Sequence, residues 1–172
     1  MTKARDYMKR IFPVILILVM IFSFTGCEQV MYDKEDFIQR ARKEFHIADA
    51  ETIEITYIGE IVKKDKALLW FMSGNESQAH RYIPIRCAIT ADGGRVFEHV
   101  YKTAERGMDI AVLIDWYGGY VFCVNNPKCK TIRIDDYSGV QEIEVTEYPF
   151  LYYNSLLPRA YFFLDENGEE IS

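Results

Sequence analysis

Turn signals that recur about every ten residues constrain this chain more than any other feature of its sequence. The motifs that mark the turns are ADGG, YGG, NNPK, DDYSG and DENG, and each separates two short runs rich in apolar residues. Within such runs apolar and polar residues alternate, as Ile53, Ile55 and Tyr57 do with the polar residues between them. This period of two is typical of a half-buried strand. We therefore expect antiparallel strands joined by tight turns.

The residues of two predicted strands indicate where each strand lies in a sheet. The run ALLWFM, residues 67–72, is apolar throughout, which favours a central strand with both faces buried. In the strand that contains Ile83, Ile85 and Cys87, Pro84 has no N–H to donate to a neighbouring strand. That strand is therefore expected at an edge of the sheet, or with a bulge at the proline.

One amphipathic helix is predicted ahead of the strands. Asp33 precedes Asp36 by three residues, an arrangement of acceptors that is typical of a helix start. Apolar residues then follow with helical spacing: Phe37, Ile38, Ala41 and Phe45. We expect a single α+β domain, residues 33–172, in which this helix packs on a bent antiparallel β-meander. A small β-barrel with the helix at its mouth is the alternative.

The N-terminal segment has the pattern of an export signal. An apolar run from Ile11 to Phe24 follows a basic start that contains Lys3, Arg5, Lys9 and Arg10. The run is shorter than the roughly 20 apolar residues of a helix that spans a bilayer. A basic start, a short apolar middle and a small-residue end are typical of a signal peptide.

The run ends in Phe24-Thr25-Gly26-Cys27, and these residues resemble the lipobox of bacterial lipoprotein precursors. The resemblance covers residues 1–27 only. It implies that residues 1–26 are a signal peptide, cleaved between Gly26 and Cys27, and that the Cys27 thiol carries diacylglycerol. Residues 27–32 would then form a lipidated tether, and two acyl chains hold a protein on a membrane stably. An uncleaved anchor helix and a secreted, unlipidated protein are the alternatives.

The charge of the chain excludes some partners. Its formal net charge is −6, and residues 27–172 are more acidic still because the N-terminal segment is basic. An acidic chain without a basic stripe is not expected to bind nucleic acid, or to attach to anionic lipid through its surface. We expect the extracytoplasmic face of a bacterial cell membrane, with the lipid bilayer contacted through diacylated Cys27.

Three cysteines follow Cys27 in the sequence. Cys123 and Cys129 flank the turn VNNPK, and they can form a disulfide if the segments on either side are adjacent strands. An exported protein can retain such a bond, and two unpaired core cysteines are the alternative. Cys87 alternates with isoleucines and is expected in the core. No C-x2-C pair is present, so neither a metal nor another cofactor is expected.

No catalytic residues can be assigned from the sequence. It contains neither the G-x-S-x-G pattern of a nucleophile elbow nor a glycine-rich phosphate loop. The histidines, His46, His80 and His99, form no recognisable motif. Glu98 is adjacent to His99, but neighbours in a strand point to opposite faces of the sheet.

An aromatic cluster is the remaining candidate for a contact site. Trp116, Tyr117 and Tyr120 surround a Gly-Gly turn. Aromatic side chains exposed at loop tips can stack on sugars or anchor a protein partner, and packing in the core is their alternative use. We expect a membrane-anchored binding or protein-interaction module with an unidentified protein or glycan partner. An envelope enzyme with a site assembled from distant residues, and an assembly factor of an envelope complex, are the alternatives.

Overall fold

The computed structural model of the chain describes residues 29–45, 52–74, 80–105 and 109–171. Strands account for 55% of the described residues and helix for 9%, so the fold is mostly β. The predicted α+β class is therefore wrong. The α+β prediction assumed that a helix covers the one buried face of a single sheet. In the structure most of the buried sheet surface is covered by other sheets.

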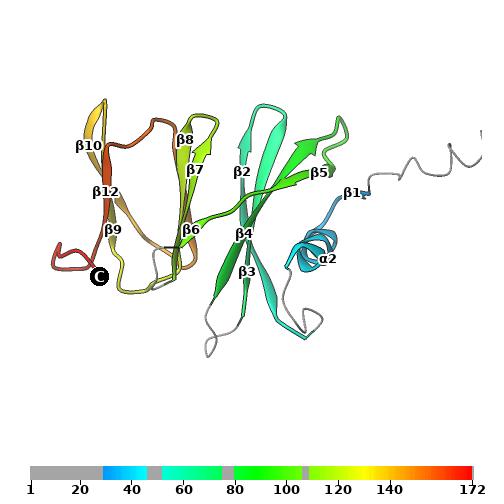
Figure 1. Cartoon of the computed structure of the whole chain (residues 1–172), viewed down its shortest axis with the longest axis horizontal. Coiled ribbons are helices and arrows are strands. Elements are labelled where there is room, and N and C mark those ends of the chain that lie inside the picture. Colours follow the sequence, from blue (N-terminus) through cyan, green and yellow to red (C-terminus); the bar gives the residue numbers. More distant parts are fainter. Residues whose placement is uncertain (1–28, 46–51, 75–79, 106–108, 172) are drawn as a thin grey trace, which may run out of the picture.

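Three antiparallel sheets, rather than one meander, make up the described part of the chain (Figure 1). The first sheet has the order β1-β5-β4-β3-β2, the second β11-β8-β7-β6 and the third β10-β9-β12. The strands of the first sheet are β1 (Val30–Met31), β2 (Ile55–Lys63), β3 (Lys66–Ser73), β4 (Arg81–Ile89) and β5 (Arg95–Val100). Those of the second are β6 (Ala104–Glu105), β7 (Ile110–Trp116), β8 (Gly119–Val124) and β11 (Phe150–Asn154). Those of the third are β9 (Thr131–Asp136), β10 (Gly139–Glu144) and β12 (Ala160–Leu164).

The sheets and the helix stack in layers along the longest axis of the molecule. Figure 1 shows the third sheet at the left, then the second sheet, the first sheet and finally α2 (Lys34–Glu44) at the right. A separate hydrophobic cluster fills each of the three spaces between neighbouring layers. The second and third sheets curl toward each other as a half-barrel, but α2 packs on the first sheet and not at the mouth of that half-barrel.

Strand β3 shows how one strand serves two of these clusters. Leu69 and Phe71 pack with α2, whereas Leu68 and Trp70 point to the other face and pack with the second sheet. All four side chains are at most 1% exposed. The prediction of a central strand with both faces buried is confirmed, since β3 pairs with β2 on one side and β4 on the other.

The proline-containing strand β4 is central as well, so its predicted edge position is wrong. Pro84 pairs with Trp70 of β3, and its carbonyl accepts a hydrogen bond from Tyr101 N at 2.9 Å. The nitrogen and carbonyl of one strand residue point to the same side, so the missing N–H of Pro84 lies on the β5 side. Pro84 therefore cannot donate to the carbonyl of Tyr101, its neighbour in register, and β5 ends one residue earlier, at Val100. The register shift in this pair of strands occurs two residues later, at Arg86.

The helix has the predicted start and the predicted buried face. The side chain of Asp33 accepts a hydrogen bond from Asp36 N at 3.0 Å, which satisfies one of the free N–H groups of the first turn. Phe37 and Ala41 are buried against the first sheet, together with Phe45 just beyond the helix. Ordered structure begins before this helix, because β1 pairs with β5. In the described ranges no helix has the length and hydropathy needed to cross a bilayer.

A buried carboxylate joins the second and third sheets. Asp136, at the end of β9, is 1% exposed and accepts hydrogen bonds from Ser138 N at 2.7 Å and Ser138 Oγ at 2.6 Å. The side-chain amides of Gln141 and Asn154 donate to its other oxygen at 3.2 Å each. The hydrogen bonds from Ser138 contribute most to holding the pKa of Asp136 below its ordinary value. Asn154 of β11 is thereby held against the β9–β10 hairpin.

Candidate functional site

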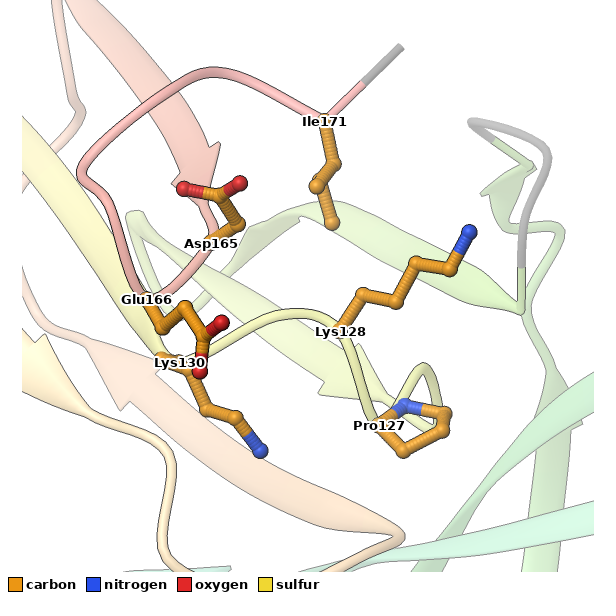
Figure 2. A pocket seen from close by; sticks show the side chains of 6 residues that line it. All are labelled: Pro127, Lys128, Lys130, Asp165, Glu166 and Ile171. Carbon is orange, nitrogen blue, oxygen red and sulfur yellow. The ribbon is translucent and has the colours of Figure 1, made fainter.

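A recess of about 440 Å³ lies where the chain enters the third sheet and where it leaves it (Figure 2). One wall is the segment between β8 and β9, and the other is the segment that follows β12. The volume is in the range of small-molecule sites, which is about 300–1,000 Å³. The residues that line it are Pro127, Lys128, Lys130, Asp165, Glu166 and Ile171.

The basic wall is a turn that presents two lysines. Asn126 closes the turn, because its Oδ1 accepts from Lys128 N at 2.9 Å and its carbonyl accepts from Cys129 N at 3.0 Å. Cys129 is fully buried, so the lysines on either side of it, Lys128 and Lys130, both project outward. In Figure 2 the side chain of Lys128 lies on the same side as Pro127, whereas that of Lys130 lies on the other side, beside Glu166.

Lys130 also has a protein partner on the edge of the recess. Its Nζ donates to the hydroxyl of Tyr148 at 3.2 Å and lies 5.3 Å from the centroid of that ring. The Tyr148 hydroxyl in turn donates to the carbonyl of Cys129 at 2.6 Å. Tyr148 therefore holds one lysine in place, whereas no hydrogen bond or ion pair of the Lys128 ammonium is found among the described residues.

The acidic wall is the turn after β12. Asp165 Oδ1 accepts from Asn167 N at 2.8 Å and from Glu169 N at 3.0 Å, so its carboxylate is committed to the turn. The backbone hydrogen bond from Glu169 is the largest cause of a lowered pKa at Asp165, which keeps this group ionised. Glu166 is exposed, and no hydrogen bond or ion pair of its carboxylate is found in the described ranges.

The recess is lined by charges of both signs that do not pair with each other. The ion pairs found among the described residues involve none of Lys128, Lys130, Asp165 and Glu166. Ile171 lies above the space between the two walls (Figure 2). The recess therefore offers two ammonium groups, one free carboxylate, one committed carboxylate and a small apolar surface from Pro127 and Ile171.

A second polar cluster, which the sequence did not reveal, lies between the first and second sheets. His80 Nδ1 is 2.8 Å from Asp109 Oδ1, and the His80 side chain is 11% exposed. The Tyr82 hydroxyl lies 3.4 Å from the same oxygen, and burial raises the pKa of Tyr82. Asp109 has a positive φ of 58°, which is uncommon for a residue with a side chain. Its carbonyl accepts from Asn125 N at 2.8 Å.

The predicted aromatic contact site is not one surface. Trp116 is 1% exposed and packs in the core between the first and second sheets, where its Nε1 has no partner among the described residues. Tyr120 belongs to the opposite core and contacts Tyr161. Only Tyr117 is exposed, at 40%. The ring of Tyr117, in the turn after β7, packs edge-on against Trp116 with a centroid distance of 5.1 Å, whereas Tyr120 of β8 points to the opposite face of the sheet.

The possible disulfide between Cys123 and Cys129 is not formed. Both cysteines are free and fully buried, as is Cys87. Cys123 faces the first sheet, whereas Cys129 packs between the second and third sheets, so the two thiols lie on opposite sides of the second sheet. The segments around VNNPK do not pair with each other, because β8 and β9 belong to different sheets. Burial raises the pKa of all three thiols.

The structure describes some of the remaining residues that the sequence analysis singled out, but not all of them. Gly26, Cys27 and His46 lie outside the described residues. Glu98 pairs with Lys66 and Arg86, and the ring of His99 packs edge-on against Tyr101. Within the described ranges no group of three or more His, Cys, Asp or Glu side chains is placed to hold a metal ion.

Comparisons with other proteins assign no family. No protein-family model matches the chain, and neither a curated protein nor a solved structure shows significant similarity to it.

Proposed function

We propose that this protein is a lipid-anchored binding module on the extracytoplasmic face of a bacterial membrane, with the recess of Figure 2 as its ligand site. The observation that carries the proposal is the recess itself, with unpaired charges of both signs around one cavity. Charged groups that line a concave surface without protein partners are suited to bind a ligand, since the ligand can supply the missing partners.

The position of the recess agrees with an anchor at Cys27. Only two residues separate Cys27 from Val30, where β1 begins. Figure 1 places β1 and α2 at one end of the long axis, and the C-terminal turn with the third sheet at the other. An anchored molecule would therefore hold the α2 end close to the bilayer and present the recess away from it.

The anchor is tested by the intact mass of the protein extracted from its own membranes. The expected mass is that of residues 27–172 with diacylglycerol on Cys27. A mass that retains residues 1–26, or one without lipid, would contradict this part of the proposal.

The ligand site is tested by thermal unfolding of the full chain in detergent with a panel of small polar molecules. A ligand of the recess should raise the midpoint of wild type and have less effect on Lys128→Ala, because a ligand that binds the folded state stabilises it. Lys128 is exposed and its side chain has no described partner, so the fold should tolerate this variant. The proposal fails if no stabilising compound depends on Lys128.

Acid–base catalysis is a second candidate, favoured by the contact between His80 and Asp109. A carboxylate on Nδ1 fixes the orientation of an imidazole and leaves Nε2 for proton transfer. The test is hydrolysis of p-nitrophenyl acetate by wild type, His80→Gln and the control His99→Gln. A catalytic His80 requires that the first variant lose activity and the second retain it, whereas equal activity in all three removes this candidate.

A further inference from the structure

We propose that the ligand of the recess is a small zwitterion with a carboxylate and a primary ammonium group, such as a short peptide or an amino acid. This inference rests on the proposed binding site and specifies its chemistry. The ligand carboxylate would lie at Lys128 and the ligand ammonium at Glu166, on the two sides of the recess that Figure 2 shows.

The charges of the recess favour a ligand that carries both signs. Asp165 already accepts two backbone N–H groups and stays ionised, so it contributes negative potential without offering a free oxygen pair. Lys128, Lys130 and Glu166 remain for direct contact. A ligand with only a carboxylate would leave Glu166 unpaired, and its negative charge would lie close to the carboxylates of Asp165 and Glu166. A ligand with only an ammonium group would leave both lysines unpaired.

The positions of the walls explain why the protein does not neutralise these charges itself. The backbone of Lys130 is hydrogen-bonded to Leu164 O at 2.8 Å, immediately before Asp165, so the two walls meet at their base. Above that contact, Tyr148 holds the Lys130 ammonium and the backbone of the turn holds Asp165. Lys130 and Asp165 are therefore held by other partners, and Lys128 and Glu166 are left without an ion pair at a cavity that a ligand can enter.

The small apolar surface of the recess favours a ligand with a short carbon skeleton over one with a bulky side chain. Pro127 and Ile171 are the apolar residues that line the recess, and Ile171 is only partly buried. They offer contact to the few carbon atoms between a carboxylate and an ammonium group, but no deep pocket for a large side chain. Glycylglycine matches this description and serves as the probe.

Binding is measured from backbone amide chemical shifts of the ¹⁵N-labelled full chain in detergent, during titration with glycylglycine. Two blocked analogues are compared: N-acetylglycylglycine, which lacks the ammonium, and glycylglycinamide, which lacks the carboxylate. Glycylglycine should shift the amides of the two walls, and each blocked analogue should bind about tenfold more weakly, as expected for the loss of a charge-assisted contact.

Substitutions assign the two ends of the ligand. Lys128→Gln should weaken glycylglycine about tenfold and leave the affinity for glycylglycinamide nearly unchanged, because that analogue has no carboxylate to lose. Glu166→Gln should show the converse pattern with N-acetylglycylglycine. Lys102→Gln and Glu54→Gln remove exposed charges of each sign elsewhere, so both controls should bind glycylglycine as wild type does.

The inference is overturned if the blocked analogues bind as tightly as glycylglycine, or if glycylglycine shifts no wall amide at roughly 50 mM, a concentration at which even a weak small ligand binds. Failure of the inference differs from failure of the proposed function. A stabilising compound from the panel that depends on Lys128 would keep the recess as a binding site even when glycylglycine does not bind.

Discussion

The contact between β8 and β11 makes one glycine far more sensitive to substitution than its neighbour. A Cβ at Gly119 would lie 2.1 Å from Asn154 O and 2.8 Å from Tyr153 Cε2, so the strands must separate by about 1 Å to restore ordinary contact. Asn154 cannot move freely, because its side chain is hydrogen-bonded to Asp136 and to Leu156 O. Overpacking of a rigid core costs about 1–3 kcal/mol, and we expect Gly119→Ala to reach the upper end of that range.

Gly118 provides the matched control. It has a positive φ of 76°, and a Cβ added to it would meet no heavy atom within 4 Å, so Gly118→Ala introduces conformational strain without a clash. The expected cost is that of a left-handed residue with a side chain, about 1 kcal/mol. Adjacent glycines thus test two different physical effects in the same hairpin.

Equilibrium unfolding of the full chain in urea measures both substitutions. The chain has two tryptophans, Trp70 and Trp116, and both are buried between the first and second sheets, so their fluorescence reports loss of that core. Gly119→Ala should lower the free energy of unfolding by roughly 2 kcal/mol more than Gly118→Ala does. An equal loss of stability for both variants, or a larger loss for Gly118→Ala, would refute the view that the side-chain hydrogen bonds of Asn154 keep β11 from moving away from β8.

Other consequences of the structure can be tested by unfolding measurements and by thiol labelling. Lys64 is exposed at a positive φ of 56°, so Lys64→Gly should raise the free energy of unfolding by about 0.5 kcal/mol; a loss of stability would contradict this. The pKa of Asp136 is lowered in the folded state, so the ionised carboxylate stabilises the fold. Its contribution to the free energy of unfolding should be complete above the ordinary carboxyl pKa and should be lost as the pH falls through the lower pKa of the folded state. Urea midpoints of Asp136→Asn should consequently depend less on pH below about 4 than those of wild type, and parallel curves would exclude this role. Cys87, Cys123 and Cys129 are buried, unpaired and have raised pKa values, so iodoacetamide should label them only after unfolding, and reductant should leave the melting temperature unchanged; a shift with reductant would indicate a disulfide.

The sequence predicts the local features of this fold because local chemistry determines them. Asp33 caps the helix whatever packs on it, and the two-residue alternation of each strand is a property of its own backbone. The assignment of strands to three sheets was not predictable in this way. It depends on which strands pair over long separations, as β9 does with β12, and a turn such as VNNPK has the same composition whether it closes a hairpin or leads to another sheet.

The candidate site was hidden from sequence analysis for the same reason. NNPK and DENG were each recognised as turns, but only the pairing of β9 with β12 brings Lys130 and Asp165 to the same recess. His80 and Asp109 are likewise 29 positions apart and meet because the first and second sheets stack. Trp116 shows the same limit, because its position next to a Gly-Gly turn was compatible with exposure or with core packing, and packing of the first sheet on the second decides for burial.

The stacking of separate sheets also determines how the molecule would respond to mechanical load. An anchor at Cys27 would pull at the α2 end, and a partner bound at the recess would pull at the other (Figure 1). Among the described strands, residues 101–103 connect the last strand of the first sheet to the first strand of the second, and no strand of one sheet pairs with a strand of the other. Tension along the long axis is therefore carried between these sheets by that connection, by side-chain packing and by a few side-chain contacts such as that of His80 with Asp109. A break between these two sheets would leave each hydrogen-bonded ladder intact on its own side.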